Sequence, residues 1–125
     1  MMRGIAFWFL AIGALSVLLG MIWGIQMSAT HDHTLSPAHA HLNLVGWVTF
    51  AIFGFYYHAV PSAAGGLAKL HLTLATLGLL AMVPGIALAV TGQTELLAIA
   101  GSFLTLASMA LFAVIVLRHG FGRPA

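Results

Sequence analysis

Histidine is the residue type in this chain whose chemistry and spacing stand out. The sequence holds seven histidines and six methionines but no cysteine, so thiolate metal sites, disulfides and thiol redox chemistry are excluded. Neutral imidazole is a common ligand of transition-metal ions. The histidines are His31, His33, His39, His41, His58, His71 and His119.

The stretch 37–61 carries three of them in an apolar segment of helix length. Ser36 is placed to cap a helix that has Pro37 in its first turn, and Pro61 ends it. The segment contains no Lys, Arg, Asp or Glu. Its roughly 24 residues can cross a bilayer core of about 30 Å at about 1.5 Å per residue. A histidine within a membrane span is costly without a partner, so these three are candidate functional residues.

Composition predicts an integral membrane protein. The chain is 62% hydrophobic and 5% charged, which a water-soluble domain of 125 residues would not show. Apolar segments separated by polar turns predict an all-α, membrane-embedded four-helix bundle, a single domain of residues 1–125 with the lipid bilayer around it. The expected spans are 5–27, 37–60, 67–90 and 95–117. Four cations and two anions are too few for a nucleic-acid surface.

The few charges predict an orientation. One side of a four-span topology receives Arg3, Lys69, Arg118 and Arg123, and the other receives Asp32 and Glu95. The positive-inside rule then places both termini in the cytoplasm and the loop from His31 to His33 outside. The expected location is the inner (plasma) membrane of a bacterium, as a multi-pass protein.

This topology sorts the histidines into two layers. The outer layer holds His31, His33, His39 and His41, and the inner layer holds His58, His71 and His119. His41 and His58 are separated by about 25 Å along one helix, so they cannot serve one metal ion. His58 and His71 lie at similar depth on antiparallel neighbours. They could hold one zinc or copper ion, or else be hydrogen-bonded to water, backbone or Tyr57.

Helical geometry separates His39 from His41. Residues two apart on a helix point about 200° away from each other, which predicts different partners on opposite faces. One stripe along the same helix contains Asn43, Trp47, Phe50, Gly54 and Tyr57. That stripe could line a flat aromatic cofactor, and the alternative is an ordinary packed core stripe.

The same stretch carries a family resemblance. The second helix of the catalytic subunit of haem–copper oxidases, most closely in the nitric oxide reductase branch, resembles His41-Leu42-Asn43-Leu44, Trp47, Phe53-Gly54, Tyr56-Tyr57 and Val60-Pro61. The run from Ala38 to His41 also resembles the H-x-H of that superfamily's tenth helix. The resemblance covers residues 37–61 of the 125.

The resemblance implies a haem site at the outer face. His41 would be an axial ligand of a low-spin haem b, and His39 would serve a different haem. Asn43, Trp47 and Gly54 would lie beside the cofactor. The family subunit arranges its helices in three arcs of four, so this chain resembles one arc, and a homo-oligomer, trimer or dimer, would rebuild a symmetrical version.

The expected function is therefore that of a small membrane haem b-binding protein in electron transfer or in oxygen or nitric oxide binding. A redox protein or quinol would be its partner. The sequence lacks a second set of three histidines for a copper site, so we expect no full catalytic centre in one chain; oxidoreductase activity would need the homo-oligomer.

The second axial ligand stays open at this point. The other helices offer Gln26, Met27, Leu88 and Ala89 at the depth of His41. The ligand is therefore Met27, a loop histidine or a residue of another subunit. Gly20 and Gly24 form a G-x-x-x-G that allows close helix approach, within the bundle or between copies.

Two other functions remain in view. A copper or zinc binding or transport protein would capture the ion at an outer set and release it at an inner pair. The outer set is His31, His33, His39, His41 and Met27, and the inner pair is His58 and His71. A purely structural subunit would keep its histidines as hydrogen-bonded packing groups.

Overall fold

The computed structural model describes residues 4–122, which are all-helical with no strand in that range. Four helices are long and apolar enough to cross a membrane: Ile5–Thr30, Ser36–Ala59, Gly66–Val90 and Leu96–His119. Each end lies within three residues of the expected spans. The prediction of four apolar helices is thereby confirmed.

The second of these helices is built from three consecutive pieces. They are α2 (Ser36–His41), the π-helix η1 (Leu42–Thr49) and α3 (Phe50–Ala59). The other long helices are α1 (Ile5–Thr30), α4 (Gly66–Val90) and α5 (Leu96–His119), and the 3₁₀ turn η2 (Pro61–Ala63) follows α3. In the wide turns of η1, the Thr49 hydroxyl donates to the carbonyl of Leu44, five residues back, at 2.9 Å.

The start of α2 differs in one detail from the expected cap. Ser36 is the first helical residue, the N-cap is Leu35, and no side chain caps the free N–H groups. The Leu35 carbonyl instead accepts from the backbone N–H of His39 at 3.0 Å. Pro37 lies in the first turn, as predicted.

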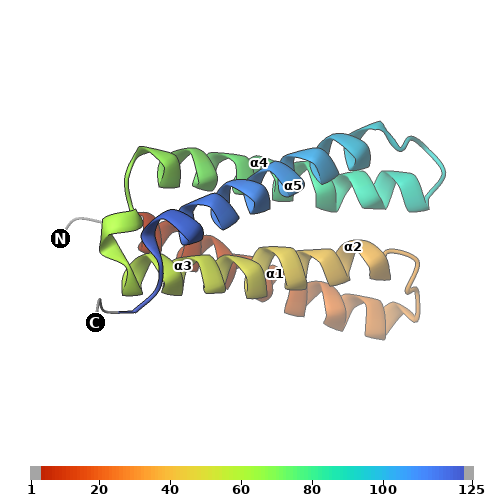
Figure 1. The fold of residues 1–125 in the computed structure, drawn as a ribbon. Helices are drawn as coiled ribbons and strands as arrows, with labels where there is room; N and C mark the ends of the chain where they lie inside the picture. The colour runs from red at the N-terminus through yellow and green to blue at the C-terminus, as the bar shows by residue number, and fades with distance from the viewer. Residues whose placement is uncertain (1–3, 123–125) are drawn as a thin grey trace.

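The four spans form two helical hairpins, which lie side by side in Figure 1. One hairpin is α1 with the α2–η1–α3 span, and the other is α4 with α5. The start of α1, the turn after α3 and the end of α5 lie at one end of the bundle (left in Figure 1), here called the His71 end. The loops 31–35 and 91–95 lie at the opposite end, here called the His41 end.

The described charges divide between these two ends. Lys69 is near the start of α4 and Arg118 near the end of α5, toward the His71 end, and Asp32 and Glu95 are in the two loops of the His41 end. Arg3 and Arg123, on which the predicted orientation also relied, are outside the described residues.

Glycines on α1 let the first hairpin close. The Asn43 side chain packs directly on Gly20, and a Cβ added to Gly24 would lie 3.2 Å from the Nε2 of His39. The G-x-x-x-G is therefore covered by the chain's own second span. Of the two interpretations given above, packing within the bundle is the one observed, and these glycines do not offer a surface to another copy.

The second hairpin is held by contacts between helix backbones. A Cβ added to Gly85 of α4 would lie 2.5 Å from the amide nitrogen of Ala98. One added to Gly101 of α5 would lie 2.6 Å from the amide nitrogen of Met82. Only glycine lets α4 and α5 approach this closely, which is how small residues promote helix packing in membranes.

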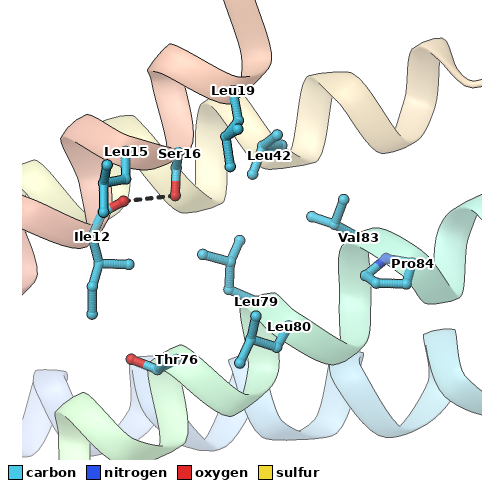
Figure 2. Close-up of a pocket in the computed structure, with 10 residues that line it drawn as sticks. All are labelled: Ile12, Leu15, Ser16, Leu19, Leu42, Thr76, Leu79, Leu80, Val83 and Pro84. Carbon is cyan, nitrogen blue, oxygen red and sulfur yellow. Dashed lines mark hydrogen bonds between the residues drawn. The ribbon is translucent and has the colours of Figure 1, made fainter. Parts of the chain in front are cut away.

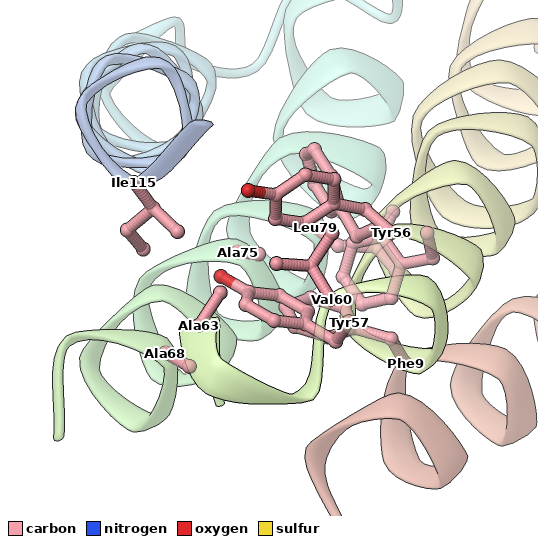
Figure 3. Close-up of a cluster of buried hydrophobic side chains, with 11 residues drawn as sticks. Phe9, Tyr56, Tyr57, Val60, Ala63, Ala68, Ala75, Leu79 and Ile115 are labelled. Carbon is pink, nitrogen blue, oxygen red and sulfur yellow. The ribbon is translucent and has the colours of Figure 1, made fainter. Parts of the chain in front are cut away.

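Aromatic side chains join the two hairpins at the His71 end. Phe9, Tyr57 and Ile115 are among the buried residues of this cluster and come from α1, α3 and α5 (Figure 3). His71 of α4 is fully buried with them. Its ring centroid lies 4.4 Å from that of Phe53 and 5.2 Å from that of Phe112. The core of the molecule is therefore concentrated at this end.

Candidate functional site

His39 faces inward, between α2 and α1. Its Nε2 lies 2.9 Å from the carbonyl oxygen of Gly20. A carbonyl oxygen only accepts, so Nε2 carries the proton and donates it. The Asn43 amide lies 3.3 Å from the same nitrogen, and the Trp23 ring meets the imidazole edge-on at 5.9 Å. In this arrangement the Nε2 of His39 is not available to bind a metal.

His41 faces outward, and its proton is on the other ring nitrogen. Its Nδ1 lies 2.8 Å from the Pro37 carbonyl oxygen, one turn earlier on the same helix, and the residue is exposed. Because the carbonyl accepts, Nδ1 carries the proton, which leaves the lone pair of Nε2 free. Metal-binding histidines commonly donate one ring N–H to a backbone carbonyl in this way, which fixes the tautomer and the ring orientation.

The two histidines thus have different partners on different sides of the helix, as their spacing predicted. Spacing alone did not show which of them is enclosed. The deciding contact is the carbonyl of Gly20 in the middle of α1, which the sequence did not reveal as an acceptor. The Pro37 carbonyl was also missed, although its position four residues before His41 is a signal that could have found it.

The expected cofactor-lining stripe is filled by α1. Asn43 packs on Gly20, and a Cβ on Gly13 would lie 3.4 Å from the Trp47 ring. A Cβ on Gly54 would lie 3.1 Å from the Ala6 carbonyl oxygen. The stripe is therefore a seam between two helices, the packed alternative given above. Asn43, Trp47 and Gly54 do not line an open cofactor face in this structure.

The outer loop presents its histidines to solvent. His31 ends α1 in the left-handed conformation, with φ of 57°, and both His31 and His33 are exposed. Between them, Asp32 accepts hydrogen bonds from the hydroxyl and the backbone N–H of Thr34. These bonds, the hydroxyl one foremost, hold the pKa of the Asp32 carboxyl below its usual value. The carboxylate therefore folds back onto its own loop.

The outer set does not converge on one point. Within residues 4–122, no three His, Cys, Asp or Glu side chains are grouped so that they could hold one metal ion. Met27, the other expected member, is buried and lines a hollow of about 140 Å³ together with Trp23, Gln26 and Asp32. Among the described residues of this outer set, His41 is thus the exposed imidazole that a hydrogen bond orients.

At the His71 end, the two expected partners lie in different surroundings. His58 is exposed and lines a hollow of about 300 Å³ against Ala6 and Leu10 of α1. His71 is enclosed by aromatic rings, and its Nδ1 lies 2.8 Å from the hydroxyl of Tyr57. The structure does not bring His58 and His71 together. Both lie toward the same end of the bundle, because α3 ends and α4 begins there, but this does not fix the direction in which each side chain points.

The Tyr57–His71 contact gives a stability prediction. Tyr57→Phe should lower the free energy of unfolding by about 1–3 kcal/mol, because it leaves the buried Nδ1 of His71 without a partner. Thermal unfolding in detergent, followed by circular dichroism, measures the change. Tyr56→Phe is the matched control: its hydroxyl donates to the Gly120 carbonyl at 2.7 Å, where solvent can replace it. An equal or larger effect at Tyr56 would contradict the prediction.

Comparison of the chain with protein-family models, with curated proteins and with solved structures found no match.

Proposed function

We propose that this chain is a small membrane haem b-binding protein that acts in electron transfer or gas binding, with His41 as an axial ligand. The observation that supports this is the hydrogen bond from Nδ1 of His41 to the Pro37 carbonyl. It orients an exposed imidazole whose Nε2 has a free lone pair. Such a group has no packing role within the chain, and a ligand would account for it.

The surroundings of His41 suit a large apolar cofactor. Leu44 and Val48, on the following turns, are 61% and 43% exposed. They are exposed apolar side chains that follow His41 in the same span. A haem held by two imidazoles supplies a six-coordinate iron suited to electron transfer, and one held by a single imidazole leaves a position for a gas.

The second ligand in this proposal is His41 of another copy. His39 donates to the Gly20 carbonyl, and Met27 is buried. A two-fold dimer presents the same patch from both subunits, so it would place two His41 side chains opposite each other. A three-fold trimer would instead bring three imidazoles to its axis, an arrangement typical of zinc or copper sites rather than haem.

Two measurements on the protein purified in mild detergent test this assignment. The visible spectrum should show a Soret band, with the α and β bands of a reduced b-type haem after dithionite. Native mass measurement should show a dimer carrying one haem. A haem-free protein would overturn the proposal, as would a haem-loaded monomer. A trimer that binds zinc or copper and no haem would favour the metal-binding alternative.

The same proposal includes membrane insertion with both termini in the cytoplasm. It rests on the four apolar helices and on the separation of Lys69 and Arg118 from Asp32 and Glu95. Reporter fusions after residue 123 and within the loop 31–35 should therefore report opposite compartments. The same compartment for both fusions would contradict the topology.

A further inference from the structure

A hollow of about 360 Å³ near the middle of α1 is lined almost entirely by hydrocarbon, and Figure 2 shows it between α1 and α4. Ser16 and Thr76 bring the two hydroxyl groups of this lining. The Ser16 hydroxyl donates to the Ile12 carbonyl of its own helix at 2.8 Å, and the Thr76 oxygen is buried. None of its lining residues in the described part of the chain is charged. This hollow therefore suits hydrocarbon groups and has nothing to bind a charged one.

A smaller hollow of different chemistry lies at the His41 end of α1. Its volume is about 140 Å³, and its walls are the last two turns of α1 and the loop that follows. The residues that line it are Trp23, Gln26, Met27 and Thr30 of α1, and Asp32 and Leu35 of the loop. Pockets for drug-sized ligands begin at about 300 Å³, so this hollow suits a small polar group.

The Asp32 carboxylate brings a negative charge to the smaller hollow. Its Oδ1 accepts hydrogen bonds from the backbone N–H and the hydroxyl of Thr34, at 3.0 and 2.6 Å. Its Oδ2 has no hydrogen-bond partner among the described residues. The described lysine and arginine, Lys69 and Arg118, lie toward the opposite end of the bundle and do not neutralise it. One oxygen thus holds the carboxylate in place, and the other is left for a ligand.

Two further walls of this hollow suit a cation. The Gln26 side chain is exposed and makes no hydrogen bond within the described residues, so its carbonyl oxygen is a free acceptor. Trp23 is half-buried, and an indole ring attracts a cation placed over its face. A carboxylate, an amide oxygen and an aromatic ring are together the groups that bind an ammonium ion.

We propose that the smaller hollow binds a primary ammonium group, with Asp32 as its counter-ion and Gln26 as a second acceptor. Such a group carries three N–H donors and can therefore bond to both side chains at once. The hollow extends over about 10 Å at the end of α1, from Trp23 to Thr30. In the proposed membrane topology this is the headgroup level, where tryptophan is enriched. The ammonium group can thus come from a phosphatidylethanolamine headgroup or from a soluble amine.

Ethanolamine is the soluble probe. Saturation-transfer NMR measures its binding to the whole protein in a detergent that carries no amine. Asp32→Asn keeps the shape of the side chain and an oxygen that can accept from Thr34. It should weaken binding about five- to tenfold, an effect between that of an exposed ion pair and that of a hydrogen bond to a charged group. Gln26→Leu should weaken binding about threefold, the effect of one hydrogen bond.

Mixed micelles with equal amounts of phosphatidylethanolamine and phosphatidylglycerol test the lipid source. Native mass spectrometry measures which lipid the protein retains, and Asp32→Asn should lose a preference for phosphatidylethanolamine that wild type shows. This preference without ethanolamine binding identifies the ligand as a lipid headgroup, and ethanolamine binding without it identifies a soluble amine. Either result supports the ammonium site, and binding of neither probe overturns it.

Glu95→Gln is the matched control. Glu95 is the other acidic residue of the chain and lies in the other loop of the same end, but it does not line this hollow. Its variant should bind both probes as wild type does. Ethylene glycol, which matches ethanolamine in size and has no charge, should bind more weakly than ethanolamine.

Three results would overturn the proposal: wild-type binding by Asp32→Asn, an equal loss in Glu95→Gln, or equal binding of ethylene glycol and ethanolamine. The site does not include His41, so haem content in the same samples should be unchanged. The ammonium site and the haem assignment can therefore fail separately.

Discussion

Replacing His41 with alanine is expected to lower the haem retained by the purified protein at least about tenfold, because the substitution removes an oriented axial ligand. The folded bundle should survive. His41 is exposed, and its hydrogen bond is to Pro37 of its own helix, so no contact between helices depends on its ring. Soret absorbance per protein chain measures the loss, and far-UV circular dichroism checks the fold.

Two other histidines are the controls for this experiment. His58→Ala removes an exposed histidine from the same span at the opposite end and should leave the Soret band unchanged. His39→Ala should reduce thermal stability, because the bond to the Gly20 carbonyl is lost, while haem is retained. Added imidazole should restore part of the absorbance to a His41→Gly variant. An unchanged Soret band in His41→Ala removes His41 as a ligand.

Introducing a methyl group at Gly85 is expected to destabilise the second hairpin by about 3 kcal/mol, the upper end of the cost of overpacking. The Cβ would lie 2.5 Å from the amide nitrogen of Ala98, and a backbone cannot turn aside as a flexible side chain can. Helices α4 and α5 would have to separate. Thermal unfolding of the Gly85→Ala variant in detergent measures this cost.

The same substitution at Gly66 provides the comparison. Gly66 begins α4 and has no atom within 4 Å of an added Cβ. Gly66→Ala should therefore leave the unfolding temperature unchanged or raise it slightly, since alanine favours the helix. Gly101→Ala, which faces the backbone of Met82, should behave like Gly85→Ala. Equal stability of Gly85→Ala and Gly66→Ala would show that the helices do not meet here as closely as described.

The four helices were predictable because an apolar chain in a membrane must pair its backbone groups within each span. Runs of apolar residues between polar turns therefore fixed where each helix lies. The ends of the helices were predicted less closely. Helix α1 runs to Thr30, three residues past the expected end, and the Thr30 hydroxyl bonds there to the Gln26 carbonyl. A polar residue that satisfies its own helix in this way does not end it.

The side-chain environments were only partly predictable. The spacing of His39 and His41 gave opposite directions, but the partner of His39 is a backbone carbonyl of α1, a group that every residue of that helix carries, so residue types did not single it out. The stripe from Asn43 to Tyr57 was drawn with a uniform helical period, and the π-helix over residues 42–49 interrupts that period. Side-chain chemistry was visible in the sequence, and helix–helix contacts were not.

The wide turns of residues 42–49 also affect which insertions and deletions the sequence can accept during evolution. A π-helix accommodates one residue more than an α-helical turn of similar length, so this segment can gain or lose a residue without breaking the span. Each such change would rotate the His41 end of the span relative to its His71 end, and because α1 runs unbroken along both, His39 would leave the Gly20 carbonyl or Gly54 would leave Ala6. The relative angle of the two parts is therefore held by α1, and a single inserted or deleted codon in residues 42–49 would reset that angle only by breaking one set of these contacts.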